Sequence, residues 1–208
     1  MTMLTIILPH KRNPGNDAAL RVALDCLYTN TVNDFILISD AATNQPLYER
    51  VNRMVKQAAT NCVVYFCSDM FAAPGWDVPM LHLWDYTTFV TGVVVEPGIM
   101  GCHPDNVARD FGRKPETFRR AEFETWALEG QMPTGVGFPA PFMFSRQRFI
   151  EMGGLQTGLP GDAQGFTPAD LMLFERHEQE GGAVRRARSY FYHLQRYSEI
   201  DEQTKEGR

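Results

Sequence analysis

Short apolar runs alternate with helical patterns along the first half of the chain. Continuous apolar stretches cover residues 4–8, 35–38, 62–66 and 91–95, and their length and β-branched content are typical of buried strands. Helical periodicity covers residues 18–27 and 47–59, and a further helix is expected over 116–128. The order strand, helix, strand, helix, strand predicts an α/β, Rossmann-like fold with a mostly parallel central sheet flanked by helices.

Size and composition fit one globular domain over residues 1–208. The chain is 44% hydrophobic and 22% charged, and no repeat or linker divides it. No apolar run reaches the roughly 18 residues of a membrane-spanning helix, and the N-terminus lacks a basic leader. We therefore expect a cytoplasmic protein that does not use a membrane. Residues 198–208 are polar and are predicted to form a flexible tail.

Charge and cysteine content limit the partners further. The net charge of -5 argues against a protein that coats nucleic acid, and the four cysteines include no Cys-x-x-Cys zinc pattern. Two basic clusters remain, each of which either meets an anionic ligand or forms a solvated face. They consist of Arg109, Arg113, Lys114, Arg119 and Arg120, and of Arg185, Arg186 and Arg188.

Candidate binding residues follow the predicted strands, because ligands of such sheets bind beyond the carboxyl ends of the strands. Pro9 ends the first run, Asp40 follows the second, and Ser68 and Asp69 follow the third. A P-loop and a complete Gly-x-Gly-x-x-Gly fingerprint are absent from the first strand, which disfavours an ATPase or a dinucleotide enzyme. There is no Gly-x-Ser-x-Gly elbow and no His-Glu-x-x-His helix either.

Several segments, in this order, resemble the GT-A glycosyltransferases of the family 2 kind. Residues 5–9 and 35–40 resemble the opening of that family, in which an Asp-Asp pair holds the nucleoside. Residues 65–70 and 73–77 resemble its Asp-x-Asp segment and the following Pro-Gly-Trp, and residues 144–154 resemble the stretch that leads to the acceptor side. Ala169-Asp170 keeps the spacing of its Glu-Asp helix, and His193 lies where a late metal-binding histidine is often found.

The resemblance implies a role for each matched residue. Asp40, Pro9 and Ser68 would contact the nucleotide-sugar donor, while Asp69 and His193 would share one Mn²⁺ or Mg²⁺ with its diphosphate. Residues 1–97 would form the donor-binding half and 98–197 the acceptor-side half. The chain would then move a sugar to an acceptor hydroxyl, with Asp170 as the base of an inverting displacement. The acceptor stays open between a saccharide, a protein and a hydroxylated DNA base, although the net charge does not favour DNA.

Three acidic positions of the family pattern are occupied by other residues. Ser39 replaces the first residue of the Asp-Asp pair, Cys67 replaces the first of Asp-x-Asp, and Ala169 replaces the glutamate before Asp170. The loss at Cys67 leaves fewer oxygen ligands for a hard cation. An inactive GT-A-like binding module is therefore one alternative. A sugar-phosphate nucleotidyltransferase is another, since residues 10–15 faintly match its basic, glycine-containing loop.

Each candidate also has a structural interpretation. Asp69 can serve as a turn residue before Pro74-Gly75, Asp40 as a cap, and His193 as a satisfied edge histidine. Thr167-Pro168-Ala169-Asp170 is a good helix start. A helix N-terminus lowers the pKa of a carboxyl group and weakens it as a base, unless the site is dry or the proton moves late in the transition state. Proximity of Asp69 to His193 is the geometric condition that separates the metal site from these interpretations.

Overall fold

The structure is a computed structural model, which describes residues 3–41, 45–98, 105–130, 132–133, 140–158 and 169–194. The predicted N-cap Thr167, the glycines of residues 135–137, Cys102 and the tail 198–208 lie outside these ranges. Within the described residues, no helix has both the length and the apolar character needed to cross a membrane.

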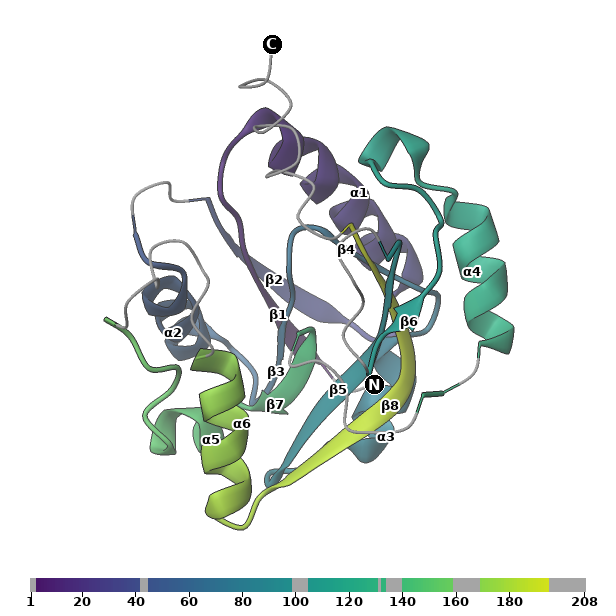
Figure 1. Cartoon of the computed structure of the whole chain (residues 1–208). Helices are drawn as coiled ribbons and strands as arrows, with labels where there is room; N and C mark the ends of the chain where they lie inside the picture. Colours follow the sequence, from purple (N-terminus) through teal and green to yellow (C-terminus); the bar gives the residue numbers. More distant parts are fainter. Residues whose placement is uncertain are drawn as a thin grey trace.

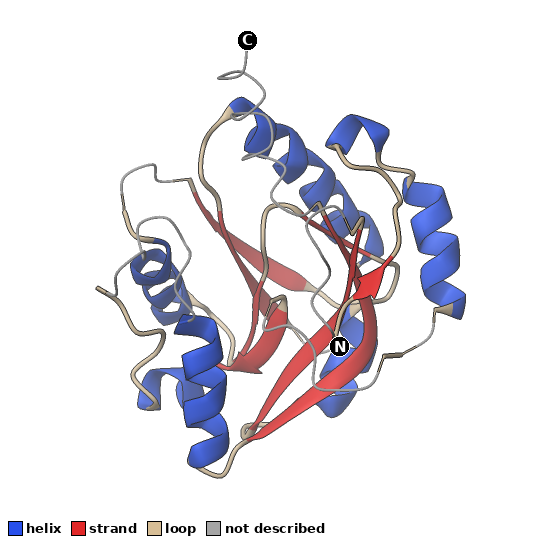
Figure 2. Cartoon of the chain, in the orientation of Figure 1, coloured by secondary structure: helices blue, strands red, loops and turns tan. Residues whose placement is uncertain are grey.

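In the described ranges, eight strands form one sheet, and six α-helices and a short 3₁₀ turn over Pro115–Thr117 accompany it (Figures 1 and 2). The strands are β1 (Leu4–Pro9), β2 (Phe35–Asp40), β3 (Cys62–Tyr65), β4 (Met70–Ala72), β5 (Thr88–Glu96), β6 (Val107–Ala108), β7 (Phe142–Ser145) and β8 (Ala183–His193). The helices are α1 (Pro14–Asn30), α2 (Leu47–Gln57), α3 (Asp77–Leu83), α4 (Arg120–Glu129), α5 (Arg146–Glu151) and α6 (Ala169–Gln179).

The sheet is mixed, which corrects the prediction of a mostly parallel one. Its order is β2-β1-β3-β7-β5-β8-β4, with β6 beside β5. The three strands β2, β1 and β3 are parallel, as their alternation with α1 and α2 indicates. Strand β7, however, runs antiparallel between β3 and β5, and β4 runs antiparallel to β8. An apolar run indicates a strand but carries no information on its direction. The expectation that residues 35–38 are buried is also wrong, because β2 is an edge strand whose side chains are half-buried or exposed.

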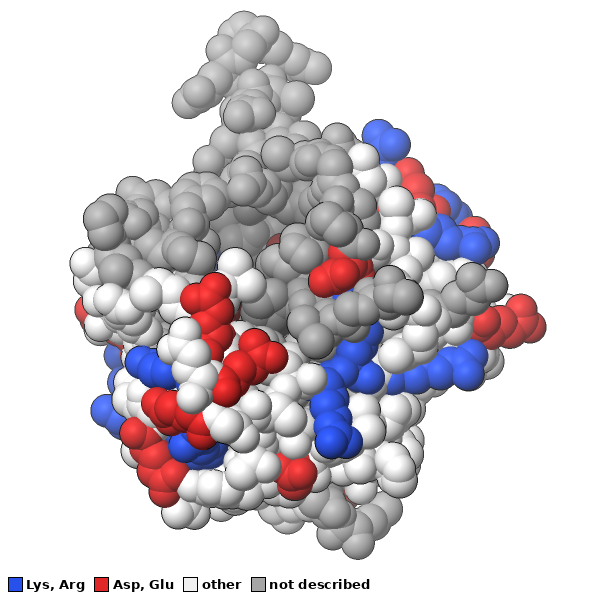
Figure 3. All heavy atoms as spheres, turned by 60° about the horizontal axis from the view of Figure 1, so that its bottom comes forward, with Lys and Arg blue, Asp and Glu red and all other residues white. Residues whose placement is uncertain are grey.

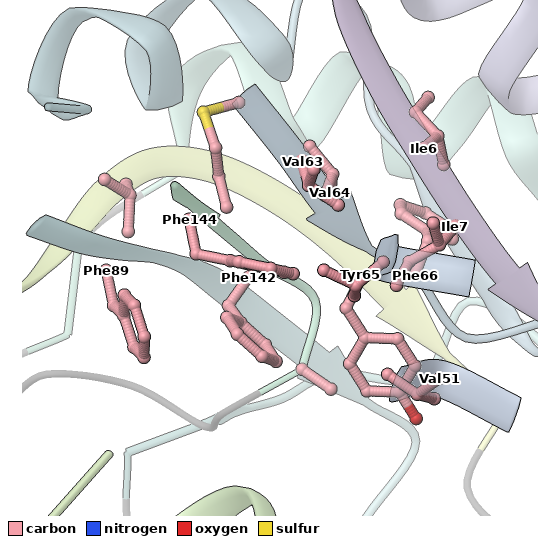
Figure 4. Close-up of a cluster of buried hydrophobic side chains, with 14 of the residues drawn as sticks. Ile6, Ile7, Val51, Val63, Val64, Tyr65, Phe66, Phe89, Phe142 and Phe144 are labelled. Atoms are coloured by element: carbon pink, nitrogen blue, oxygen red, sulfur yellow. The ribbon is translucent and has the colours of Figure 1, made fainter. Parts of the chain in front are cut away.

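Two buried clusters hold the helices to the sheet. The first contains the strands β1, β3 and β7 with α2, α5 and α6, and its aromatic centre includes Phe89, Phe142 and Phe144, with ring centroids 5.0 to 6.0 Å apart (Figure 4). The second joins α1 and α4 to β5 and β8. In Figure 1, α2, α5 and α6 lie together on the left, and α1 and α4 lie on the right.

The pairing of β5 with β8 carries an irregularity within its length. The register shifts between Thr91 and Val93, around Gly92. A Cβ atom at Gly92 would lie 2.2 Å from the ring of Phe191, so only glycine permits this approach. Beyond the shift the two strands pair again up to Val95 and Tyr192, which brings Glu96 and His193 to neighbouring strand ends.

Candidate active site

The ends of β1 and β2 place Pro9 beside Asp40, and α2 fixes them there. Pro9 and Asp40 are direct partners in the parallel register. The buried Arg50 of α2 donates Nη2–H to the backbone oxygen of His10 at 2.8 Å and to that of Asp40. The Asp40 carboxylate also pairs with Arg53. Asp40 is therefore held between two guanidinium groups at the carboxyl edge of the sheet.

Asp69 and His193 meet at the other side of this edge. Asp69 lies in the turn between β3 and β4, next to the half-buried Ser68, and the β4–β8 register sets Met70 opposite His193. The backbone N–H of Leu194 donates to the Asp69 carbonyl at 3.1 Å. Side chains follow the same pairing, with Asp69 Oδ2 3.4 Å from His193 Nε2. The proximity that a shared ion requires is therefore present.

The other ring nitrogen of His193 faces a residue that the sequence interpretation missed. His193 Nδ1 lies 2.8 Å from Oε1 of Glu96, and Glu96 Oε2 accepts from Asn106 Nδ2 at 3.1 Å. The Glu96 side chain is only 8% exposed. Glu96 is the first residue after the predicted strand 91–95, so the rule that singled out Asp40 and Asp69 would have found it had it been applied to this strand.

The three side chains perturb one another strongly. Burial disfavours the charged imidazole, but the adjacent carboxylates of Asp69 and Glu96 outweigh burial and raise the pKa of His193 to about 10. For Asp69 burial likewise opposes the charge, and attraction and hydrogen bonding to His193 lower its pKa. Without an ion, the imidazolium of His193 thus lies between two carboxylates.

Asp69 and His193 fit a divalent cation in spacing and in donor type. Two neighbouring ligands of an octahedral ion with bonds of roughly 2.1 Å lie about 3 Å apart, close to the 3.4 Å observed. A carboxylate oxygen with an imidazole nitrogen suits Mn²⁺ somewhat better than Mg²⁺. Among the residues that the structure describes, no group of three His, Cys, Asp or Glu side chains is arranged to hold an ion. An ion bound here therefore needs further oxygen ligands from a substrate or from water.

Cys67 lies in the same turn as Asp69, between β3 and β4. Burial raises the pKa of the Cys67 thiol, and the charges of Asp69 and Asp170 raise it further, so that both carboxylates are within electrostatic reach of one sulfur. The thiol is neutral and supplies no hard ligand. Asp170 lies in the first turn of α6, and the buried Ala169 that replaces the family's glutamate faces the core.

Asp170 meets the condition under which a carboxyl group at a helix start is not weakened as a base. The helix start contributes as expected, since the backbone N–H of Leu171 donates to Asp170 Oδ1 at 2.9 Å. Burial is the larger effect, and it raises the pKa of Asp170. Asp170 is therefore a stronger proton acceptor than an ordinary aspartate.

Three members of the first basic cluster form ion pairs within the fold. Arg113 and Arg119 contact Asp110, Arg119 also contacts Glu122, and Arg120 pairs with Asp25 and Glu124. On the face shown in Figure 3, side chains of both signs lie together at the left and at the upper right, and a group of Lys or Arg side chains lies to the right of the centre. These pairs support the interpretation of the cluster as a solvated structural face.

A cavity of about 580 Å³ lies away from these residues, beside the C-terminal end of α2 and the start of α5. Its polar lining is bonded within the fold, because Arg146 donates to the carbonyls of Val55 and Lys56, and Asn61 accepts from the N–H of Gln147. Its position at the amino end of β3 separates it from the strand ends that carry Asp69 and His193.

No family model and no curated protein sequence matches the chain. Among solved structures it is similar to GalNAc-T7 crystallised with UDP, GalNAc and Mn²⁺, with a TM-score of 0.59 and 12% identity over 92% of this chain and 43% of that one. It is also similar to a mutant of Drosophila β-1,4-galactosyltransferase 7 crystallised with manganese, UDP-Gal and xylobiose, with a TM-score of 0.47 and 12% identity over 89% of this chain and 65% of that one. The chain thus spans less than two thirds of either neighbour. Its mixed, helix-flanked sheet is the GT-A fold of glycosyltransferases.

Proposed function

We propose that this chain transfers a sugar from a nucleotide-diphosphate sugar to an acceptor hydroxyl, with the help of a divalent metal ion. The observation that carries the proposal is the contact of Asp69 with His193, 3.4 Å apart at strand ends of a GT-A fold. This pair, together with the basic carboxylate of Asp170, supplies the groups that such a reaction needs.

The donor would lie across the carboxyl ends of β2, β1 and β3. Asp40 and Pro9 would contact the nucleoside, and Ser68 and Asp69 would face the diphosphate. Strands two positions apart in a sheet are separated by about 10 Å, so the two ends of the donor would have separate contact points. Arg50 and Arg53 hold the Asp40 carboxylate in a fixed orientation.

Asp69 and His193 would hold the ion through Oδ2 and Nε2. A bound divalent ion neutralises the negative charge that develops on the departing nucleoside diphosphate. Before the ion binds, His193 Nε2 must give up its proton, and Asp69 is already ionised because its pKa is lowered. The chain contributes two ligands, and the oxygens of the donor diphosphate complete the site.

Asp170 would act as the base of a single inverting displacement. Its carboxylate takes the proton of the acceptor hydroxyl as the acceptor oxygen bonds to the anomeric carbon, and the bond from that carbon to the diphosphate oxygen breaks. The raised pKa of Asp170 suits this step. A saccharide, a protein hydroxyl and a hydroxylated DNA base all fit this chemistry as acceptors.

A screen of UDP-, GDP- and dTDP-sugars, each with and without Mn²⁺, tests the proposal. We expect release of the nucleoside diphosphate from at least one donor, and a higher rate with Mn²⁺ than with a chelator. Donor binding without release from any donor, in the presence of the acceptor classes named above, would contradict catalysis.

The second candidate is a nucleotide-sugar-binding module without catalysis. The neutral, buried thiol of Cys67 favours it, because it removes one hard ligand from the metal site. The same screen separates the two functions when binding is followed by calorimetry. A module would bind donor with an affinity that does not depend on Mn²⁺ and would release no product.

A further inference from the structure

Glu96 forms a chain of contacts with His193 and Asn106 at the ends of β5 and β8. The carboxylate accepts from Asn106 through one oxygen and lies 2.8 Å from His193 Nδ1 through the other. Both are short enough for good hydrogen bonds. The side chain is almost completely buried, so these contacts are its polar environment rather than a chance surface encounter.

We propose that Glu96 is a positioning residue of the metal site, which holds His193 with Nδ1–H bonded to its carboxylate and with Nε2 turned toward Asp69. The inference rests on the proposed function, because it assumes that an ion binds between Asp69 and His193. It adds a residue that neither the family pattern nor the strand-end motifs include.

The geometry explains why a hydrogen-bond acceptor is needed at this point. A neutral imidazole carries its proton on one of two nitrogens, and only the nitrogen without a proton can bind an ion. The carboxylate of Glu96 can accept but not donate, so it selects the form with the proton on Nδ1 and frees Nε2. Carboxylates that orient a metal-binding histidine in this way strengthen the ligand.

Charge balance supports the same assignment. Asp69 and Glu96 bring two negative charges around one imidazole. A divalent ion on Nε2 replaces one proton there and neutralises both carboxylates, while Nδ1–H stays with Glu96. Loss of Glu96 would leave the ring free to rotate and, before an ion binds, would leave its proton free to occupy either nitrogen.

A variant at position 96 is expected to fold, because the backbone hydrogen bond that this residue makes does not depend on its side chain. Its backbone oxygen accepts from the N–H of Arg109 at 2.8 Å and continues the β5–β6 pairing. Glu96→Gln is the matched control. Its amide oxygen can still accept from His193 Nδ1–H, and its NH₂ can donate to Oδ1 of Asn106, which has no hydrogen bond within the described residues.

The experiment measures Mn²⁺ affinity of the full chain in the presence of UDP by electron paramagnetic resonance. Wild type, E96A, E96Q and His193→Ala are compared at near-neutral and at mildly alkaline pH, so that proton competition at Nε2 is separated from ring orientation. We expect E96A to weaken Mn²⁺ binding about 10- to 100-fold at both pH values. E96Q should bind close to wild type, and melting temperatures show that each variant is folded.

Equal Mn²⁺ affinity in wild type and E96A would overturn the inference and leave the proposed function intact, provided that His193→Ala loses binding. If E96A and E96Q weaken Mn²⁺ binding equally, the inference that Glu96 acts by accepting a hydrogen bond from His193 Nδ1–H would also be overturned. If wild type with UDP does not bind Mn²⁺, Glu96 has no ion site to serve and the inference fails. In that case, sugar transfer measured in the presence of a chelator would show that the transferase activity does not need an ion.

Discussion

Two aspartates eight positions apart, Asp69 and Asp77, serve opposite edges of the sheet. Asp77 is fully buried, and its two oxygens accept from the backbone N–H groups of Val32 and Asn33 at 3.0 and 2.9 Å and from the Asn33 side chain at 2.8 Å. Asp69 is one-third exposed and faces the imidazole of His193. The hydrogen bonds of the Asp77 carboxylate are made within the fold, whereas the Asp69 carboxylate faces an imidazole that can itself bind a ligand.

The difference shows how to separate structural from functional charges in this chain. Around Asp77 each donor is a neutral amide, and the contacts join the α1–β2 connection to α3. At Asp69 the partner is ionisable, and the pKa of His193 and that of Asp69 shift in opposite directions. Shifts of this kind, at a strand end, are typical of functional sites. Variants at the two edges should therefore have separable effects on stability and on activity.

The largest effect is expected for Asp69→Ala. Removal of one of the two protein ligands should abolish metal-stimulated donor turnover, a loss of several kcal/mol of transition-state stabilisation. The free energy of unfolding should change by less than about 1 kcal/mol, because the contact is partly exposed and His193 keeps Glu96. Donor turnover with and without Mn²⁺ measures the first effect, and thermal unfolding measures the change in stability. Unchanged Mn²⁺ stimulation would refute the metal assignment.

Asp170→Asn should reduce sugar transfer about 10²- to 10⁴-fold, as expected for loss of a general base. Asparagine can still accept from the Leu171 N–H, and it removes a charge that burial disfavours. The melting temperature should therefore stay level or rise slightly. Single-turnover transfer is the measurement, and hydrolysis of the donor by water is the internal control. A variant that keeps most of its transfer rate would show that Asp170 only caps the helix.

The sequence predicts the first three strands of the fold well, because each of them is a continuous apolar run. Residues 4–8, 35–38 and 62–66 lie within or largely within β1, β2 and β3. Strand direction beyond β3 was not predictable. Strand β7 is an apolar run like the others, and only its antiparallel contacts with β3 and β5 show that the sheet is mixed.

Some candidate site residues were predictable from the local sequence, and others depend on contacts between distant parts of the chain. Strand ends indicated Asp40 and Asp69, since topology alone brings such ends to one edge. The Asp69–His193 spacing depends on the β4–β8 pairing, which joins residues 70 and 193 and is invisible in local periodicity. Glu96, Arg50 and the desolvation of Asp170 depend on side-chain packing from distant elements. Their roles in catalysis and binding stay predictions.

Asp77→Ala tests the structural side of the comparison. The change leaves the backbone N–H groups of Val32 and Asn33 without their acceptor, and each buried orphan costs about 1 to 3 kcal/mol. We expect a loss of about 2 to 4 kcal/mol in the free energy of unfolding, measured by urea denaturation. Mn²⁺ affinity of the folded fraction should be unchanged. Loss of Mn²⁺ binding in folded protein would mean that the two edges are coupled.

Asp40→Ala should weaken nucleotide binding by about 1 to 3 kcal/mol, the range for loss of a charge-assisted hydrogen bond. Asp40→Asn is the control, since it keeps an acceptor while it removes the charge that pairs with Arg53. Calorimetry with UDP, GDP and dTDP compares the three proteins. If Asp40→Ala binds nucleotide as tightly as wild type, the carboxylate serves only to anchor α2 to the strand ends.

The smallest effect, and the one with the clearest sign, is the pH dependence of Asp170. Burial raises its pKa above the ordinary value of about 3.9, so the acid limb of kcat/KM should lie above the usual aspartate range, with transfer falling as pH falls through it.

The contribution of Asp170 to the free energy of unfolding should change with pH in the opposite direction. The folded protein binds this proton more readily than the unfolded chain, so the contribution of Asp170 to stability rises as pH falls through its folded pKa. Asp69 has a lowered pKa and contributes stability that is lost on acidification. Asp170→Asn should cancel the first contribution and leave the second, as measured by the difference in unfolding free energy between wild type and variant across the acidic range. A difference that does not vary with pH would mean that the carboxyl group of Asp170 titrates alike in the folded and unfolded chain, and that burial has not prepared it to accept a proton.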